Sequence, residues 1–147
     1  MIVVILISLG VLFILQFSVL HGSENTRQTF TQQQLASNTL NAFVLTTTSC
    51  QGLDVTELVQ DCAGFRAVNC SGISSCGFLD GLSRSLFNKT LRTWEKRYNF
   101  TAVSGRTVLF GSAFEGCPGT KDTSVYPIPP RDGGDKIFVR LEVCGGN

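Results

Sequence analysis

Cysteine is the residue type whose number and spacing in this chain most clearly suggest chemistry. All six cysteines follow residue 20, and they are Cys50, Cys62, Cys70, Cys76, Cys117 and Cys144. An even number of cysteines is typical of a disulfide framework in an oxidising compartment. A zinc site is the competing interpretation, but Cys62, Cys70 and Cys76 are separated by seven and five residues, longer than zinc-knuckle spacing. We therefore predict three disulfides and no metal site, with the pairing left open.

Three N-x-[ST] sequons suggest a second kind of modification. They begin at Asn69, Asn88 and Asn99, and such sequons accept N-linked glycans on the surface of secreted proteins. Asn88 is expected near the centre of the polar face of a helix, where a glycan would not clash. At Asn69 a disulfide through the neighbouring Cys70 would crowd a glycan. The alternative for all three is an ordinary polar residue, and we favour it for Asn69.

Nucleophilic catalysis is not indicated by the sequence. A catalytic Ser or Cys usually needs a His that accepts its proton, and the only histidine is His21, before the predicted domain. The segment Gly81-Leu82-Ser83-Arg84-Ser85 lacks the final Gly of a nucleophile elbow. Paired carboxylates of a glycosidase stay open as an alternative, because eleven acidic residues always contain pairs. We expect that the chain is not an enzyme.

Phosphate, calcium and nucleic-acid sites are equally weakly indicated. Gly111 and Gly116 have Walker spacing, but Cys117-Pro118 replaces the Lys and hydroxyl that hold phosphate and Mg²⁺. Asp132 and Asp135 flank a Gly-Gly pair, which is more typical of a solvated turn than of a calcium site. The net charge of +1 argues against a broad attraction to nucleic acid. No cofactor and no nucleic-acid partner are expected.

The first twenty residues, from Met1 to Leu20, decide where the other residues act. Fifteen of them are Ile, Leu, Val or Phe, and the first charged residue of the chain is Glu24. As a helix, this segment would rise about 30 Å, the thickness of a bilayer's hydrocarbon core. A cleaved signal peptide is the alternative, but the segment lacks a basic start and ends in Ser18-Val19-Leu20, a poor cleavage site. We predict a retained single-pass anchor in the lipid bilayer.

The sequence divides into three segments on this basis. Residues 1-20 are the predicted transmembrane anchor, residues 21-49 a helical extension or a stalk, and residues 50-147 an extracytoplasmic α+β domain. No Pro or Gly interrupts the chain between Ser23 and Cys50. Within that stretch the apolar residues at near-helical spacing are Ala36, Leu40, Phe43 and Val44. A helix packed along one stripe is therefore expected, ending at the β-branched Thr46-Thr47-Thr48 run, and a flexible polar stalk is the alternative.

Two more helices are predicted inside the domain. Asp54-Val55-Thr56-Glu57 has the spacing of a capping box, so a short helix should run through Cys62 with Leu58 inward. A disulfide-pinned loop is expected between residues 64 and 77, and Ser75 should cap a longer helix that runs to about Arg97. The predicted apolar arc of that helix is Leu79, Leu82, Leu86, Phe87, Leu91, Trp94 and Tyr98. The predicted polar side is Arg84, Asn88, Arg92 and Lys96.

Strands are predicted in the last third of the chain. Residues 100–103 and 107–110 flank a short loop that contains Gly105, as in a hairpin. An irregular stretch should follow over residues 111–121, then an edge strand over 125–128 beside several prolines. Residues 137–143 alternate apolar and polar side chains, the clearest strand signal in the chain. The expected fold class is α+β, with a spine helix, short helices and a small antiparallel sheet stapled by disulfides.

An apolar N-terminal helix that precedes a small disulfide-bearing sheet domain resembles the type IV pilin-like proteins. The apolar N-terminus and the sequons are more similar to the archaeal members, and residues from Met1 to about Thr46 would correspond to the spine helix. In that family the apolar helix is held in the membrane and then packs with its neighbours in the filament core. The resemblance implies that copies of this chain, or other pilin-like subunits, are its partners.

Two features depart from the family pattern. Prepilins carry a basic leader and a small-residue cleavage site before the apolar stretch, whereas this sequence starts directly at Met1-Ile2-Val3. Bacterial pilins also place a Glu early in the helix, where this chain has only apolar residues up to Ser8. Either the true start lies upstream or processing does not occur.

The expected function is that of a non-enzymatic, membrane-anchored surface protein. It would be a pilin-like structural subunit or a minor filament component, located in the cell membrane with its C-terminal domain outside the cytoplasm. The alternative is a membrane-tethered extracellular binding module that does not polymerise, or a secreted domain if the N-terminus is cleaved. A secreted or anchored enzyme is a third and more distant interpretation.

Overall fold

The computed structural model describes residues 24–115, 117, 119–131 and 133–145, with their side chains from Gln32 onward. The chain divides into two compact units, Met1–Thr31 and Gln32–Asn147. In the first unit the described residues 24–31 are helical. The predicted anchor lies outside the described residues. None of the helices in the described part of the chain is long and apolar enough to cross a bilayer.

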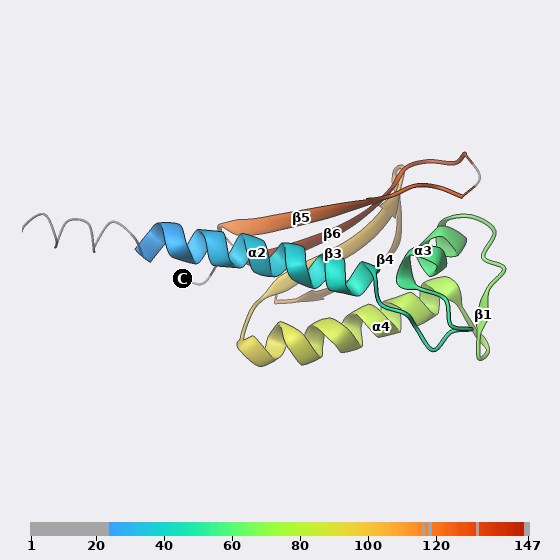
Figure 1. The fold of residues 1–147 in the computed structure, drawn as a ribbon, viewed down its shortest axis with the longest axis horizontal. Helices are drawn as coiled ribbons and strands as arrows, with labels where there is room; N and C mark the ends of the chain where they lie inside the picture. The colour runs from blue at the N-terminus through green and yellow to red at the C-terminus, as the bar shows by residue number, and fades with distance from the viewer. Residues whose placement is uncertain (1–23, 116, 118, 132, 146–147) are drawn as a thin grey trace, which may run out of the picture. The chain divides into compact units, whose positions relative to one another are not determined.

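Helix α2 is Glu24–Val44 (Figure 1), and its part from residue 32 onward supplies one side of the core of the second unit. Its fully buried residues are the predicted stripe, Ala36, Leu40, Phe43 and Val44. After the helix ends, Thr47 forms an isolated antiparallel bridge with Asp54, so the backbone is extended where β-branched residues were expected to stop the helix. Residues 32–44 are therefore part of the folded domain and not a flexible stalk, and the compact unit begins before the predicted boundary at residue 50.

Helix α3, Val55–Ala63, begins with the predicted capping box. The Glu57 backbone N–H donates to Asp54 Oδ1 at 2.7 Å, and the Asp54 backbone N–H donates to Glu57 Oε2 at 3.0 Å. Two backbone N–H groups at the start of the helix, which have no partner within the helix, are thereby hydrogen-bonded. Leu58 is fully buried, as predicted.

The loop predicted over residues 64–77 contains a two-stranded hairpin, β1 (Asn69–Cys70) and β2 (Ile73–Ser74), before helix α4, Ser75–Thr90. The prediction that Ser75 caps this helix is wrong by one residue. Ser74 is the N-cap, and its Oγ accepts from the Gly77 backbone N–H at 3.3 Å. Ser75 is instead the first helical residue, and it is fully buried.

Helix α4 ends earlier than the predicted Arg97. It is followed by a 3₁₀ turn, η1 (Arg92–Trp94), and by Glu95 in the left-handed region with φ of 54°. The backbone N–H of Lys96 donates to Leu91 O, and that of Glu95 donates to Arg92 O, which is the Schellman pattern of a helix end. The prediction that Trp94 belongs to the core is therefore wrong, and its side chain is 59% exposed.

The four predicted strands form one antiparallel sheet in the order β4-β3-β6-β5. All are longer than predicted: β3 (Tyr98–Ser104), β4 (Thr107–Phe114), β5 (Lys121–Ile128) and β6 (Ile137–Cys144). Tyr98, which was predicted to continue a helix, opens β3 and pairs with Phe114 and Val143. The edge position predicted for residues 125–128 is confirmed, and an edge strand tolerates Pro127 because its missing N–H is not needed there.

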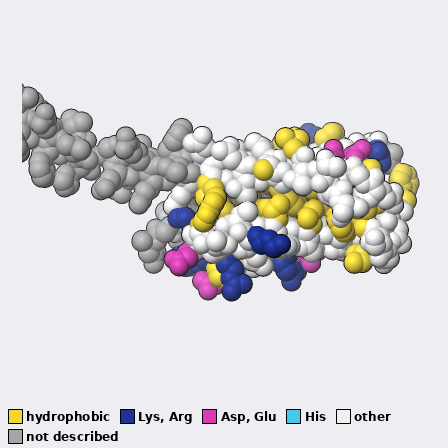
Figure 2. All heavy atoms as spheres, turned by 60° about the horizontal axis from the view of Figure 1, so that its bottom comes forward, with side chains coloured by type: hydrophobic (Ala, Val, Ile, Leu, Met, Phe, Trp, Pro, Cys, Tyr) yellow, Lys and Arg dark blue, Asp and Glu magenta, His cyan; other side chains and the backbone are white. Residues whose placement is uncertain are grey.

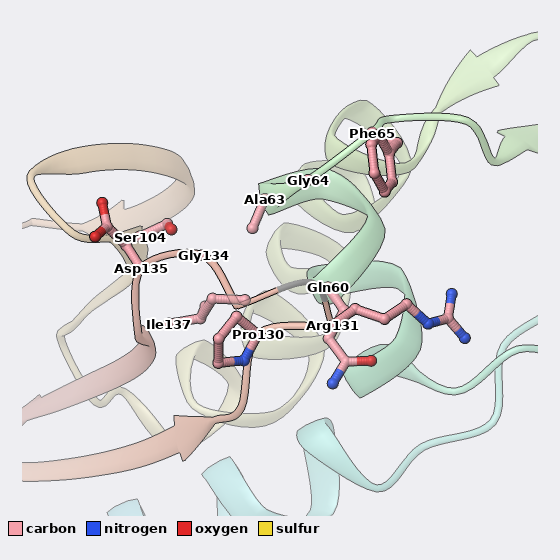
Figure 3. Close-up of a pocket in the computed structure, with 10 residues that line it drawn as sticks. All are labelled: Gln60, Ala63, Gly64, Phe65, Ser104, Pro130, Arg131, Gly134, Asp135 and Ile137. Atoms are coloured by element: carbon pink, nitrogen blue, oxygen red, sulfur yellow. The ribbon is translucent and has the colours of Figure 1, made fainter.

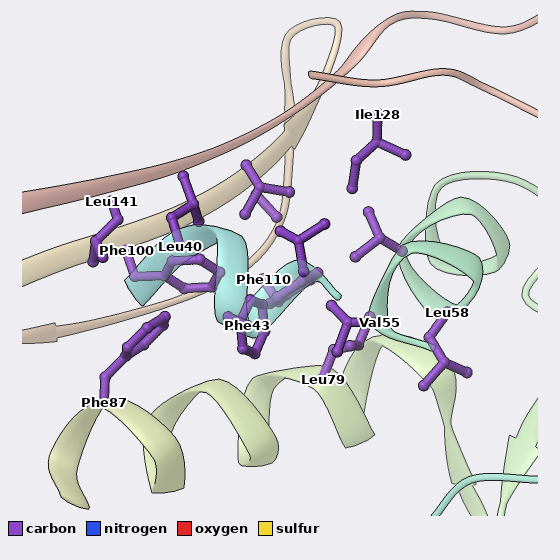
Figure 4. Packing of buried hydrophobic residues seen from close by; sticks show 14 of the residues in the cluster. Leu40, Phe43, Val55, Leu58, Leu79, Phe87, Phe100, Phe110, Ile128 and Leu141 are labelled. Carbon is purple, nitrogen blue, oxygen red and sulfur yellow. The ribbon is translucent and has the colours of Figure 1, made fainter. Parts of the chain in front are cut away.

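The core lies between one face of the sheet and the helices (Figure 4). Phe100 of β3 is its centre, with ring centroids 5.2 Å from Phe43 of α2, 4.7 Å from Phe87 of α4 and 5.9 Å from Phe110 of β4. Tilted and edge-to-face rings at these distances are favourable beyond their burial. The chain is thus an α+β protein with an antiparallel sheet, as expected, and α2 and α4 meet the sheet through the same aromatic cluster.

Candidate functional site

All six cysteines are paired, and none is free. Cys50–Cys70 joins the segment after α2 to β1, Cys62–Cys76 joins α3 to the first turn of α4, and Cys117–Cys144 joins the β4–β5 connection to the end of β6. The predicted disulfides are confirmed. Their role is structural, because two of them tie a connecting segment to a strand and the third ties two helices together.

The three sequon residues lie in different surroundings. Asn69 is exposed, and its Oδ1 accepts from the Gly72 backbone N–H. Asn99, on β3, donates from Nδ2 to Glu142 Oε2 at 3.3 Å. Asn88 accepts a hydrogen bond from Tyr98 Oη at 3.3 Å and is half-buried beside β4. Asn88 is thus partly covered by neighbouring side chains, and glycosylation at the three positions stays a prediction.

Ser83 and Gly111, which belong to the incomplete enzyme motifs of the sequence, have structural roles in the fold. Ser83 is fully buried in α4, where its hydroxyl donates to the Asp80 carbonyl oxygen at 3.0 Å. Gly111 lies inside strand β4, and a Cβ there would come within 2.7 Å of the Phe100 carbonyl oxygen. Glycine at this position allows β3 and β4 to approach each other. Asp132 lies outside the described residues.

One hollow of about 300 Å³ lies between the end of α3 and the β5–β6 connection (Figure 3). Ser104 and Asp135 are at one end, and Phe65 and Arg131 are at the other. The Arg131 guanidinium is directed away from the Asp135 carboxylate. These charged groups do not converge on one point, so the hollow holds no evident catalytic arrangement.

A second hollow of about 340 Å³ lies between helix α4 and the edge strand β4, and we call it the α4–β4 pocket. Its lining residues are Arg84, Asn88, Arg92, Tyr98, Gly111, Ser112, Ala113 and Phe114. Arg84 and Asn88 are four residues apart on α4, and Arg92, the first residue of η1, follows after the same spacing. These three residues belong to the predicted polar side of the helix. Their i,i+4 spacing was visible in the sequence, but nothing there showed that β4 would lie beside them.

The charge of the α4–β4 pocket is positive. The Arg92 guanidinium lies 4.9 Å from the ring centroid of Phe114, a cation–π arrangement. Arg84 Nη2 is paired with Asp80 Oδ2 at 2.9 Å, one helical turn away. None of the lining residues is acidic. On the face that brings α4 forward, Lys and Arg side chains and a few Asp and Glu side chains lie on a mostly uncharged surface (Figure 2).

The solvent-facing side of the sheet carries a compact ionic cluster around Glu142, which is 5% exposed. Its Oε1 accepts a hydrogen bond from Lys121 Nζ at 2.9 Å and forms an ion pair with Arg140 Nη2 at 2.8 Å. The hydrogen bond from Lys121 lowers the pKa of the Glu142 carboxyl, burial opposes this, and Asn99 and Arg140 lower the pKa further. Both oxygens of the carboxylate contact side chains of the sheet strands, so we interpret this cluster as structural.

No group of three or more His, Cys, Asp or Glu side chains that could hold a metal ion occurs within the described residues. No protein-family model, curated protein or solved structure matches the chain.

Proposed function

We propose that this chain is a non-enzymatic, membrane-anchored surface protein with pilin-like architecture, acting as a structural subunit or minor component of a surface filament. The observation that carries the proposal is helix α2. The chain is helical from Glu24, the first residue that the structure describes, and residues 32–44 of this helix are built into the core of the sheet domain. A spine helix that enters the core of an antiparallel sheet domain is the layout implied by the pilin-like resemblance.

The disulfides support the location of the domain outside the cytoplasm. Thiols in the cytosol are kept reduced, whereas three structural disulfides persist in an oxidising environment. In the proposal, residues 1–20 lie in the bilayer and the domain from Gln32 onward lies on its outer side. The partners are the lipid bilayer and copies of the chain or related subunits, which would contact each other through the apolar segment as it leaves the membrane.

The anchor is tested by membrane fractionation of cells that produce the full chain. We expect the chain in the membrane pellet after an alkaline wash, and extracted by detergent. The double variant Leu9→Arg/Leu12→Arg should appear in the soluble fraction or be degraded, because each Arg near the midplane costs about 3 kcal/mol. The control variant Leu45→Arg changes a leucine that is 69% exposed and should stay in the pellet. Wild-type chain in the soluble fraction with free thiols would refute the proposal.

A tethered binding module that does not polymerise is the second candidate, and the α4–β4 pocket favours it, since a structural subunit does not require a cationic hollow. Electron microscopy of cells with an antibody against the domain separates the two candidates. Labelled filaments support the subunit, and label scattered over the cell envelope without filaments supports the tethered module.

A further inference from the structure

The α4–β4 pocket combines features that a merely structural crevice does not need. Ser112, on the face of β4 next to α4, is 8% exposed, and its Oγ is the one buried side-chain polar atom without a hydrogen-bond partner in the described part of the chain. Leaving a buried hydroxyl unpaired costs free energy, and natural structures rarely keep one without a reason. Ser112 is one of the residues that line the same hollow as Arg84 and Arg92.

Hydrogen-bond donors dominate the lining of the pocket. The arginine side chain only donates, and neither the Arg92 guanidinium nor the amide nitrogen of Asn88 is hydrogen-bonded to a described residue, although the guanidinium lies over the Phe114 ring. Tyr98 already donates its hydroxyl proton to Asn88 Oδ1, which fixes the orientation of that amide. No acidic residue lines the pocket, and among the described residues the one carboxylate paired with a lining arginine is that of Asp80, which binds Arg84 Nη2. The complement of this donor set is a group with several acceptor oxygens and negative charge.

We propose that the α4–β4 pocket binds a small polar ligand through an oxyanion group, a carboxylate or a sulfate or phosphate ester, held by Arg92 and Arg84 with Ser112 and Asn88 as further donors. Phe114 provides an apolar wall that suits the carbon skeleton of such a ligand. The volume of about 340 Å³ is at the small end of ligand pockets, which fits a ligand the size of one acidic sugar. Ligand binding in this pocket requires neither the membrane anchor nor polymerisation.

Binding is tested with the full chain in a non-ionic detergent, using glucuronate, glucose 6-phosphate, inorganic sulfate and neutral glucose as probes in separate NMR titrations. We expect the acidic sugars to shift the backbone amide signals of Gly111 to Phe114 in a saturable way, and glucose to leave them unchanged. Saturation by glucuronate alone identifies a carboxylate ligand, and saturation by the phosphate ester alone identifies a phosphoryl ligand. A response to sulfate only would mean that the pocket holds an adventitious ion only. Equal binding of glucose would show that the pocket does not recognise an oxyanion group. Either result overturns the proposal, as does the absence of any response.

Variants locate the site. Arg92→Gln should weaken binding of the acidic sugar by about tenfold or more, since it removes a charge-assisted hydrogen bond. The matched control is Arg106→Gln, an exposed residue of the β3–β4 turn that does not line the pocket, and it should change affinity less than about twofold. Equal losses in the two variants would indicate unspecific electrostatic attraction and would refute a built site.

Ser112→Ala separates a binding role from a structural one. Because the hydroxyl has no partner in the free protein, its removal should leave the melting temperature of the free chain unchanged or raise it. The same variant should bind the acidic sugar several-fold more weakly. A lowered melting temperature with unchanged affinity would show that the hydroxyl serves the fold and not a ligand.

Discussion

At the scale of single residues, the buried polar groups of this domain fall into two kinds. Asp61 and Glu142 are 8% and 5% exposed, and each accepts several hydrogen bonds. Ser112 is equally buried and has none from the described residues. Since a satisfied carboxylate holds its surroundings together and an orphan hydroxyl does not, the first two are expected to stabilise the fold and the third is not.

Asp61 offers the sharpest test of this difference. Its carboxylate accepts from the Ser75 hydroxyl at 2.6 Å and from the backbone N–H groups of Ala67 and Val68 at 2.9 and 3.2 Å. Asp61→Ala should lower the free energy of unfolding by about 3 kcal/mol, because the donors are left without an acceptor. The control Asp80→Ala breaks the exposed Arg84 pair and should cost at most about 0.5 kcal/mol. Urea unfolding of the oxidised chain measures both, and equal losses would contradict the argument.

Glu142 should make stability depend on pH. Its pKa is lowered in the folded state from the ordinary value of 4.5, first by the hydrogen bond from Lys121. Above pH 4.5 its contribution is fully present, and it is lost as the pH falls through the lower folded-state pKa. Lys121→Met should therefore flatten the fall of stability below pH 4.5. Arg106→Met, which removes an exposed cation elsewhere, should leave the fall unchanged. Thermal unfolding at a series of pH values gives the slope, and a slope as steep in Lys121→Met as in the wild type would contradict this role.

At the scale of elements, the sequence predicts a helix or strand correctly wherever its local pattern agrees with the packing of that element in the fold. The capping box at Asp54 and Glu57 marks the start of α3 without reference to any other part of the chain. The alternation over residues 137–143 also predicts a strand correctly, because β6 lies in the middle of the sheet with one face on the core. The end of α4 was missed, since the apolar periodicity continues through Trp94 while the helix stops at a Schellman turn that has Glu95, and not Gly, in the left-handed position.

That turn is open to a direct test. A non-glycine residue in the left-handed region costs about 1 kcal/mol, so Glu95→Gly should raise the free energy of unfolding by up to about 1 kcal/mol. Lys89→Gly is the control, because Lys89 is an exposed residue inside α4, where glycine should lower stability by about 1 kcal/mol. Chemical unfolding compares the two variants. If both were destabilising to the same extent, α4 would continue through residue 95 in solution, as the sequence suggested.

At the scale of the whole molecule, the disulfides could be predicted as a set but not as pairs. Cys62 and Cys76 meet because α3 and α4 pack together, and Cys117 reaches Cys144 because β6 returns beside the β4–β5 connection. The α4–β4 pocket escaped prediction for the same physical reason. Arg92 and Ser112 are far apart in sequence, and only the docking of α4 on the edge strand brings them to one hollow.

The same three disulfides set the conditions under which the domain can exist. Their sequence separations are 14, 20 and 27 residues, and loop closure of this size is worth about 3 kcal/mol for each bridge. Together they approach the total stability of a small domain, about 5–15 kcal/mol.

We therefore expect reduction of the full chain in detergent to abolish its cooperative thermal transition. The double variant Cys117→Ser/Cys144→Ser should melt about 10 °C lower while the other two bridges remain. A chain with all six cysteines replaced by Ser should match the reduced protein and no longer respond to reductant. If the reduced wild type melted at the same temperature as the oxidised one, the fold would not need an oxidising compartment, and the argument that places it outside the cytoplasm would fail with it.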